Sequence, residues 1–280
     1  MQVFPDGNTP RLGSESISAD EAKASLERDA SPIARMATET LEAKFEPDPS
    51  LDGSTDHLLD GLIEAAGDSD GAMVLRRMRD RIKGPTPEEE PEPPLAFSRM
   101  PGFVWNADAV SDWATDCLII EGDVSVDGTL HLNDLDELRC VVVLGSVTTQ
   151  NFVCGGWVFI RDNLTCTHAY ASSLNDGGLF VGGNMKVATF LETGQYVHVA
   201  GDFEATHLAM VQNEIEVRGE VSCPDFVHRS DRDRLPFWVD PGLIEQHDAE
   251  TEDGRPYRYW YPSGYDDRIL AGGSPVRAHG

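Results

Sequence analysis

Six copies of one seven-residue phrase constrain the fold of this chain more than any other feature of its sequence. The copies are LIIEGDV (118–124), VVVLGSV (141–147), VFIRDNL (158–164), LFVGGNM (179–185), VHVAGDF (197–203) and IEVRGEV (215–221). Each copy has an anchor, glycine or aspartate, at its fifth position. The anchors are 23, 17, 21, 18 and 18 residues apart, so the basic repeat is about 18 residues long. Repetition at a fixed short period predicts turns that stack on one another.

Three positions of the phrase are apolar in every copy. They lie four and two residues before the anchor and two residues after it. The eighteen residues are Leu118, Val141, Val158, Leu179, Val197 and Ile215; Ile120, Val143, Ile160, Val181, Val199 and Val217; and Val124, Val147, Leu164, Met185, Phe203 and Val221. This alternation is typical of strands with one buried face. No helix-length segment separates the copies, so the pattern favours a parallel β-solenoid over βαβ units.

A finer six-residue rhythm runs through the last turns, from Leu179 through Met185 and Leu191 to Val221. Three six-residue sides per turn predict a triangular cross-section, with the anchors at corners where glycine permits positive φ or close approach. We therefore predict a mainly β fold. It is a single-stranded parallel solenoid of about six turns, with an N-terminal helical unit and an irregular C-terminal cap.

Over residues 118–223 the sequence resembles the bactofilins, which are polymer-forming bacterial cytoskeletal proteins with triangular solenoids. The resemblance lies in the period and in the corner pattern of glycine, then Asp, Asn or Glu, then an apolar residue. It implies a scaffold that assembles through the solenoid ends. Left-handed hexapeptide acyltransferases share the six-residue period, but their fold requires a small inward residue two places before each large one. Val197, Phe203 and Ile215 stand at such places, which disfavours that enzyme class.

Composition divides the chain into an acidic helical unit (1–83), a Pro/Glu linker (84–100), the solenoid (101–223) and an aromatic-rich C-terminal cap (224–280). Ser18 and Glu21 form a capping-box pattern, and Ser31 before Pro32 marks a second helix start. Residues 58–82 indicate a helical hairpin with a basic end. Trp105 and Trp113, just before the first turn, are expected to cap the opposite end.

An outward row of the phrase, three residues before the anchor, is apolar in its first four copies, Ile119, Val142, Phe159 and Phe180. Such a stripe needs a cover. We expect the helical segment 33–82 or the C-terminal tail to pack on it, in preference to a partner; a homodimer through this face is a further alternative.

The formal net charge of −27 argues against binding to nucleic acid or to an anionic membrane and favours basic partners or simply solubility. No apolar run reaches the length of a membrane helix, and the first residues do not form a signal peptide. Five scattered cysteines fit buried thiols in a reducing cytoplasm. We expect no cofactor and no metal, because His168 and His207, in one row of the repeat, lie two turns apart.

The candidate partner-binding residues are an acidic ledge and three aromatic residues of the cap. They are Asp202, Glu204, Glu214, Glu216 and Glu220, with Trp238, Tyr259 and Trp260. No catalytic motif stands out, so the expected function is non-enzymatic binding. The leading hypothesis is a bacterial immunity protein that occludes a basic toxin. The alternatives are a bactofilin-like scaffold and a β-helix enzyme, either an acyltransferase or a polysaccharide lyase.

Overall fold

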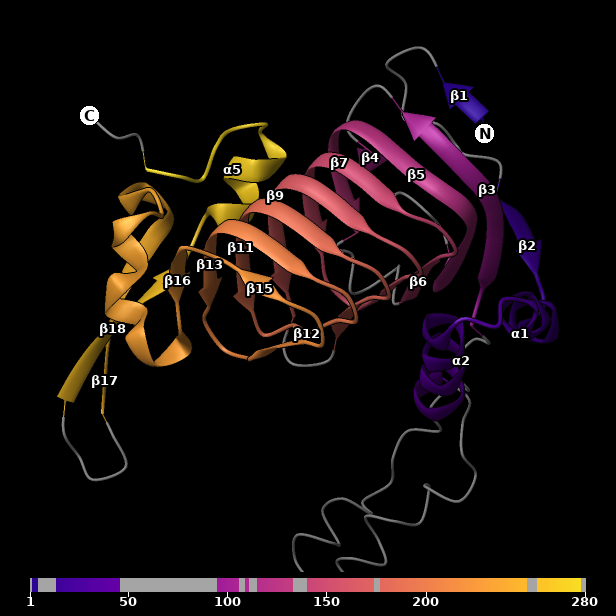
Figure 1. Ribbon diagram of the computed structural model, residues 1–280, viewed down its shortest axis with the longest axis horizontal. Helices are drawn as coiled ribbons and strands as arrows, with labels where there is room; N and C mark the ends of the chain where they lie inside the picture. Colours follow the sequence, from indigo (N-terminus) through magenta and orange to yellow (C-terminus); the bar gives the residue numbers. More distant parts are fainter. Residues whose placement is uncertain are drawn as a thin grey trace, which may run out of the picture. The chain divides into compact units, whose positions relative to one another are not determined.

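The computed structural model describes residues 2–4, 14–45, 95–105, 109–110, 115–132, 140–173, 177–250 and 256–277. The chain divides into one compact unit, residues 1–38 and 96–280, and a second unit, residues 39–95. The first unit is a parallel β-solenoid of about six turns with helices before it and a cap after it, which confirms the predicted fold class (Figure 1). The helical hairpin expected over 58–82 and Trp113 lie outside the described residues.

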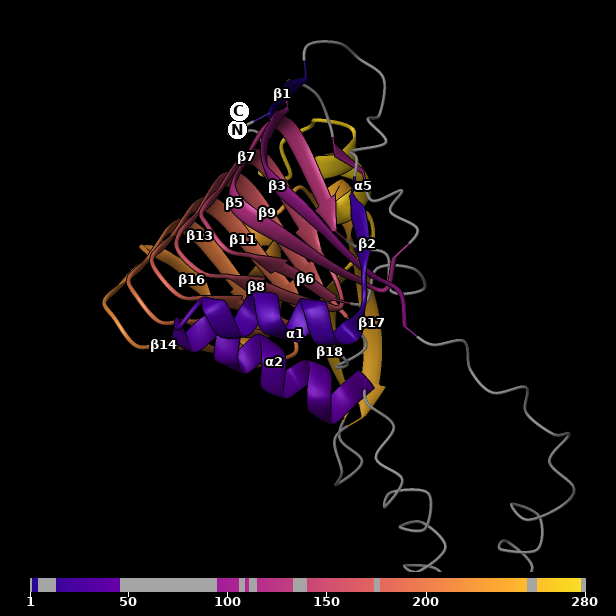
Figure 2. The ribbon, with the colours of Figure 1, turned by 90° about the vertical axis from the view of Figure 1, so that its right-hand side faces the viewer.

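Three sides of a triangle form the solenoid (Figure 2). The strands of the first side are the beginning of β5 (Cys117–Leu132), then β6 (Cys140–Val143), β8 (Trp157–Ile160), β10 (Gly178–Val181), β12 (Tyr196–Val199) and β14 (Ile215–Val217). The other two sides are the two halves of β7 (Val147–Cys154), β9 (Leu164–Ser172), β11 (Met185–Thr193) and β13 (Phe203–Met210), ending in β15 (Val221–Ser222) and β16 (Asp225–Val227). The short strand β4 (Ala109–Val110) pairs with β5.

The predicted apolar rows are stacked neighbours in the strand register. Val181 pairs with Val199 and Val199 with Val217, and the other two rows pair in the same way along the solenoid. Fifteen of the eighteen residues are buried in one core, and Ile215 and Val217 pack against its end. Val221 is the exception, because 58% of it is exposed in the last turn.

Close approach of the backbones explains the corner glycines. A Cβ atom at Gly201 would lie 2.6 Å from the carbonyl oxygen of Gly183, and one at Gly219 would lie 2.5 Å from the carbonyl oxygen of Gly201. Of the five glycine anchors only Gly122 has positive φ. Positive φ, the other reason for glycine at these corners, therefore applies to the first turn alone.

Helices α1 (Ala19–Arg28) and α2 (Pro32–Phe45) begin where the sequence predicts. The Ser18 Oγ accepts a hydrogen bond from the Glu21 amide at 3.2 Å, and the Glu21 carboxylate accepts one from the Ser18 amide at 2.9 Å, which completes the capping box. The Ser31 Oγ accepts from the Ala34 amide at 3.1 Å.

Helix α1 and the first part of α2, residues 32–38, lie side by side across the first side of the solenoid, roughly along its strands (Figure 2). The side chain of Ser25 in α1 donates to Glu121, at the end of the first-side segment of β5, while Ile33 in α2 packs directly over Gly182, just after β10. Between them, Arg161 binds Asp29 at 2.9 Å. All four residues of the apolar stripe are buried. The chain itself therefore covers the stripe.

The C-terminal segment covers another side. Its elements are 3-10 segments at Arg229–Phe237 and Pro241–Leu243, the antiparallel pair β17 (Ile244–Glu250) and β18 (Pro256–Pro262), and helix α5 (Tyr265–Leu270). They form one cluster with four outward residues of the solenoid, Val153, Tyr170, Leu191 and Ala209. The cap therefore folds along one side of the solenoid.

The two ends of the solenoid differ. At the N-terminal end, β3 (Phe97–Trp105) pairs with β5 along one edge and with β1 (Gln2–Phe4) and β2 (Glu15–Ile17) along the other. At the C-terminal end, β14, β15 and β16 pair only with the preceding turn among the described residues. The first end is closed by strands, and the second presents strand edges.

Candidate functional site

Glu204 and Glu216 of the predicted ledge have partners within the solenoid. The Lys186 ammonium lies 2.9 Å from both carboxylate oxygens of Glu204, its neighbour in the strand register. The Glu216 carboxylate accepts from the Tyr196 hydroxyl at 3.0 Å and lies 3.4 Å from the His198 Nδ1. The Tyr196 hydrogen bond, followed by that from His198, lowers the pKa of Glu216, and the same contact raises the pKa of Tyr196. Glu204 is thus paired with a cation, and Glu216 is held by hydrogen bonding within the solenoid, before any partner arrives.

Glu214 lies in the loop before β14. Its carboxylate is 3.0 Å from the Arg229 guanidinium and 3.9 Å from the His228 Nε2. Its position is therefore fixed by the first residues of the cap, so this acid helps to hold the cap against the last turn.

Asp202 belongs to a ladder of hydrogen bonds that the sequence analysis did not find. In each turn, the side chain of the residue after the anchor accepts from the backbone amide of the equivalent residue in the next turn. The bonds, from amide to acceptor, are Ser146 to Asp123 (2.8 Å), Asn163 to Ser146 (3.3 Å), Asn184 to Asn163 (2.9 Å), Asp202 to Asn184 (2.8 Å) and Glu220 to Asp202 (2.9 Å). The row of Asp, Ser, Asn and Glu after each anchor was the available signal.

Glu220 ends this ladder. Its amide donates to Asp202, but no backbone amide in the described ranges donates to its own carboxylate in turn. The next residue, Val221, is 58% exposed, and Phe226, in the row of Leu208, is 37% exposed. Within the described residues, Glu220 is the one of the five predicted acids whose carboxylate has no partner, and it adjoins the exposed Val221.

The aromatic residues of the cap fall into two groups. Trp238 is buried at 1% exposure, stacks on His207 with ring centroids 5.3 Å apart and meets Tyr265 edge to face. It holds the cap to the solenoid and is not available to a partner, so the assignment of Trp238 to the binding surface is corrected. Tyr259 and Trp260, on β18, are half-buried, and Tyr259 stacks on His247.

The row that contains His168 and His207 is a polar seam under the cap. Asn151 donates to Thr129 at 3.1 Å and to the Ile269 carbonyl of α5 at 3.2 Å. The His168 Nδ1 lies 2.8 Å from the Thr189 hydroxyl, which also accepts from Tyr265. Burial lowers the pKa of His168. Within the described residues no group of three or more His, Cys, Asp or Glu side chains is placed to hold a metal ion.

Sequence reasoning also missed Glu192, a buried carboxylate on β11, two turns before the last. It accepts hydrogen bonds from the backbone amides of Gly194, Val211, Gln212 and Asn213. Burial raises its pKa, and the four amides oppose that shift. Its register neighbours, Ala171 and Met210, belong to the apolar core, so a lone acid in an apolar row was the signal for it.

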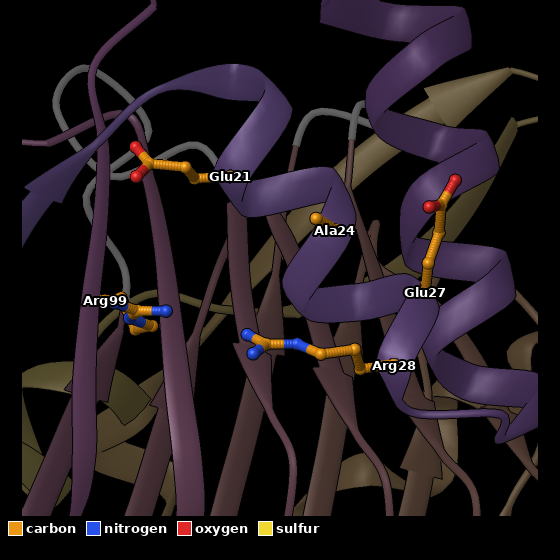
Figure 3. A pocket seen from close by; sticks show the side chains of 5 residues that line it. All are labelled: Glu21, Ala24, Glu27, Arg28 and Arg99. Carbon is orange, nitrogen blue, oxygen red and sulfur yellow. The ribbon is translucent and has the colours of Figure 1, made fainter.

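An open depression of about 520 Å³ lies beside α1 and is lined by Glu21, Ala24, Glu27, Arg28 and Arg99 (Figure 3). Both arginines approach Glu121, at 3.7 Å from Arg28 and 3.9 Å from Arg99, and Arg99 also binds Glu15 at 2.9 Å. These ion pairs hold α1 and β2 on the first turn of the solenoid.

The thiols of Cys117, Cys140, Cys154 and Cys166 are buried, and burial raises the pKa of both Cys154 and Cys166, as expected for inert apolar residues. No described helix is long and apolar enough to cross a membrane. Comparisons of the chain with protein-family models, with curated proteins and with solved structures found no match.

Proposed function

We propose that this protein is a non-enzymatic binding protein that masks a basic partner protein with the C-terminal end of its solenoid. The specific role that we propose is that of a bacterial immunity protein, which neutralises a toxin by occluding its active site. The observation that carries the proposal is the free strand edge of the last turn, where Val221 is exposed next to Glu220 and Phe226 is exposed on the following side.

Charge and exposure together support a basic partner. The last turn, residues 212–227, carries four acids, Glu214, Glu216, Glu220 and Asp225, and one base, Arg218. An apolar centre with an acidic rim complements a basic surface, and the overall charge of −27 would speed the encounter. The half-buried Tyr259 and Trp260 remain candidate contacts at the edge of such an interface.

The test uses the product of the gene adjacent to the one that encodes this chain. Expressed alone in a bacterial host, that product is expected to arrest growth, and co-expression of this chain is expected to restore it. Titration calorimetry should give a one-to-one complex that weakens as salt increases. A neighbouring product that neither harms the host nor binds this chain would remove the immunity role.

A second candidate is a self-assembling scaffold of the bactofilin type, favoured by the strand edges at the C-terminal end. The strands β1 and β2 on the outer edge of β3 oppose head-to-tail stacking. Size-exclusion chromatography and negative-stain microscopy separate the two candidates. Filaments would support the scaffold, and a discrete particle would support the binding protein.

A further inference from the structure

Each turn of the solenoid binds the next one through the same four groups around its corner. For the turn before last, these groups and their partners in the last turn are the Val199 carbonyl with the Arg218 amide (2.9 Å), the Gly201 carbonyl with the Gly219 amide (3.0 Å), the Asp202 carboxylate with the Glu220 amide (2.9 Å) and the Phe203 amide with the Glu220 carbonyl (2.8 Å). Earlier turns repeat the pattern. The Ala200 amide donates to the Val181 carbonyl, and the Met185 amide donates to the Asp202 carbonyl.

The last turn carries the same four groups and offers them outward. By register they are the Val217 carbonyl, the Gly219 carbonyl, the Glu220 carboxylate and the Val221 amide. Alternate amides of a strand point to opposite sides, and that of Phe203, in the row of Val221, points to the following turn. No described residue follows Val221 in this row, and the corner from Arg218 to Ser222 is exposed throughout.

We propose that an extended segment of a basic partner protein binds this end as one further turn of the solenoid, around the corner formed by Val217, Gly219, Glu220 and Val221. This inference rests on the proposed function and names its mode of binding. Addition of a strand to a free sheet edge draws its affinity from main-chain hydrogen bonds and its specificity from alternate side chains.

The corner dictates the sequence of that segment. A Cβ atom at Gly219 would lie 2.5 Å from the carbonyl oxygen of Gly201, so a residue that lies on Gly219 in the same way should be glycine, as in five of the six copies; the exception is Asp162. Two residues before and two after the glycine, apolar side chains would cover Val217 and Val221. The intervening side chains face outward near Glu216 and Glu220, where lysine or arginine complements the charge.

Charge and topology favour such a partner over a second copy of this chain. Two copies joined by a twofold axis at this end would bring the four acids of each last turn together, which opposes association. Head-to-tail stacking would need the outer edge of β3, which β1 and β2 already occupy.

The probe is a synthetic peptide, VKVKGKF. It copies the phrase of residues 197–203 and carries lysine in place of the residues at positions 198, 200 and 202. The control peptide, VKVKAKF, has the same charge and an alanine at the corner. Each peptide is titrated to millimolar concentration into the full-length ¹⁵N-labelled chain. The first should shift the Val221 amide resonance and slow its hydrogen exchange, and the control should bind at least tenfold more weakly.

Two variants test the chain's side of the contact. Val221→Pro removes the outward amide without removing a hydrogen bond to the preceding turn, and proline is tolerated on an edge strand; it should weaken the glycine peptide at least tenfold. Val221→Thr keeps the amide and should bind as the unchanged chain does. If Val221→Pro fails to fold, Glu220→Ala removes the carboxylate acceptor and should weaken the peptide severalfold.

The outcomes separate this inference from the proposed function. Equal binding of both peptides, a Val221 amide already protected in the free monomer, or a dimer that Val221→Pro disperses would each overturn the inference. A toxic basic neighbour that binds the unchanged chain and Val221→Pro equally would overturn it and leave the proposed function standing. Specific peptide binding at Val221 without any binding of the neighbour would support the inference and count against the immunity role.

Discussion

The amide of Glu220 donates a hydrogen bond of 2.9 Å to the carboxylate of Asp202, the residue at the same corner one turn earlier. Asp202 is therefore part of the frame of the solenoid as well as part of its acidic surface. A charge-reversal experiment at this residue would mix a loss of charge with a loss of structure. Glu220, one turn later, separates the two effects because its carboxylate has no such internal role among the described residues.

Replacement of Asp202 by alanine should lower the free energy of unfolding by about 1 kcal/mol, because the Glu220 amide loses its acceptor. Asp202→Asn should lose less, since asparagine already fills this position at residues 163 and 184. Urea denaturation measures the change. Glu204→Ala is the surface control and should cost less than about 0.5 kcal/mol; equal losses for Asp202→Ala and Glu204→Ala would contradict the ladder.

Loss of the buried carboxylate of Glu192 should be much more severe. Glu192→Ala leaves four backbone amides near the core without their acceptor, which should cost on the order of 3 kcal/mol or more. Glu192→Gln keeps one acceptor oxygen and should fall between alanine and the unchanged chain. Thermal and urea unfolding rank the stabilities of the two variants and the unchanged chain. If Glu192→Ala were as stable as the unchanged chain, the four amides would have found other acceptors.

The corner at Gly201 should not tolerate a side chain. Gly201→Ala places a Cβ atom 2.6 Å from a backbone oxygen that cannot move without shifting the previous turn, so it should destabilise the fold by about 2 kcal/mol or more. The matched control is Gly264→Ala, where the nearest atom would lie 3.7 Å away. A similar melting temperature for both variants would contradict the close-approach explanation.

The polar seam predicts a pH dependence. Burial lowers the pKa of His168 below its ordinary value of 6.5, so the unfolded chain binds this proton more readily than the folded one. The stability contributed by neutral His168 is therefore fully present above pH 6.5 and is lost as the pH falls from 6.5 through the lower pKa of the folded state. Urea unfolding between pH 8 and 5 should show a steeper decline for the unchanged chain than for His168→Gln, and parallel curves would contradict the assignment.

Arg161 should hold the helices on the solenoid. Its guanidinium binds Asp29, between α1 and α2, at 2.9 Å and Asp162 at 2.7 Å. Arg161→Ala should speed amide hydrogen exchange in residues 19–38 while leaving β11 and β13 protected. Lys186→Ala, which removes an exposed pair elsewhere, is the control. Unchanged exchange in α1 would show that apolar contacts alone fix the helices.

The sequence was most informative where a pattern repeats. Period-two alternation in six aligned copies predicted the register of Val181, Val199 and Val217, because stacking makes every turn face the same environment. The cap could not be placed in the same way, since its residues do not repeat and its contacts with Tyr170 and Leu191 join distant segments. Trp238 shows the consequence, because an aromatic residue in an irregular segment can equally be an anchor for a partner or for its own fold.

The candidate site was predicted only in part, because sequence shows where acids lie and not what neutralises them. Lys186 stands 18 residues before Glu204, and the repeat length alone could have paired them. The open end was not predictable, since it depends on where the cap goes.

The outward stripe changes from apolar to polar after Phe180. Its four apolar members are buried, and the two residues that follow them are His198, which is also buried at 5% exposure, and Glu216, which is exposed. A chain shortened to begin after α2 would therefore expose an apolar strip along one side of the solenoid and should aggregate.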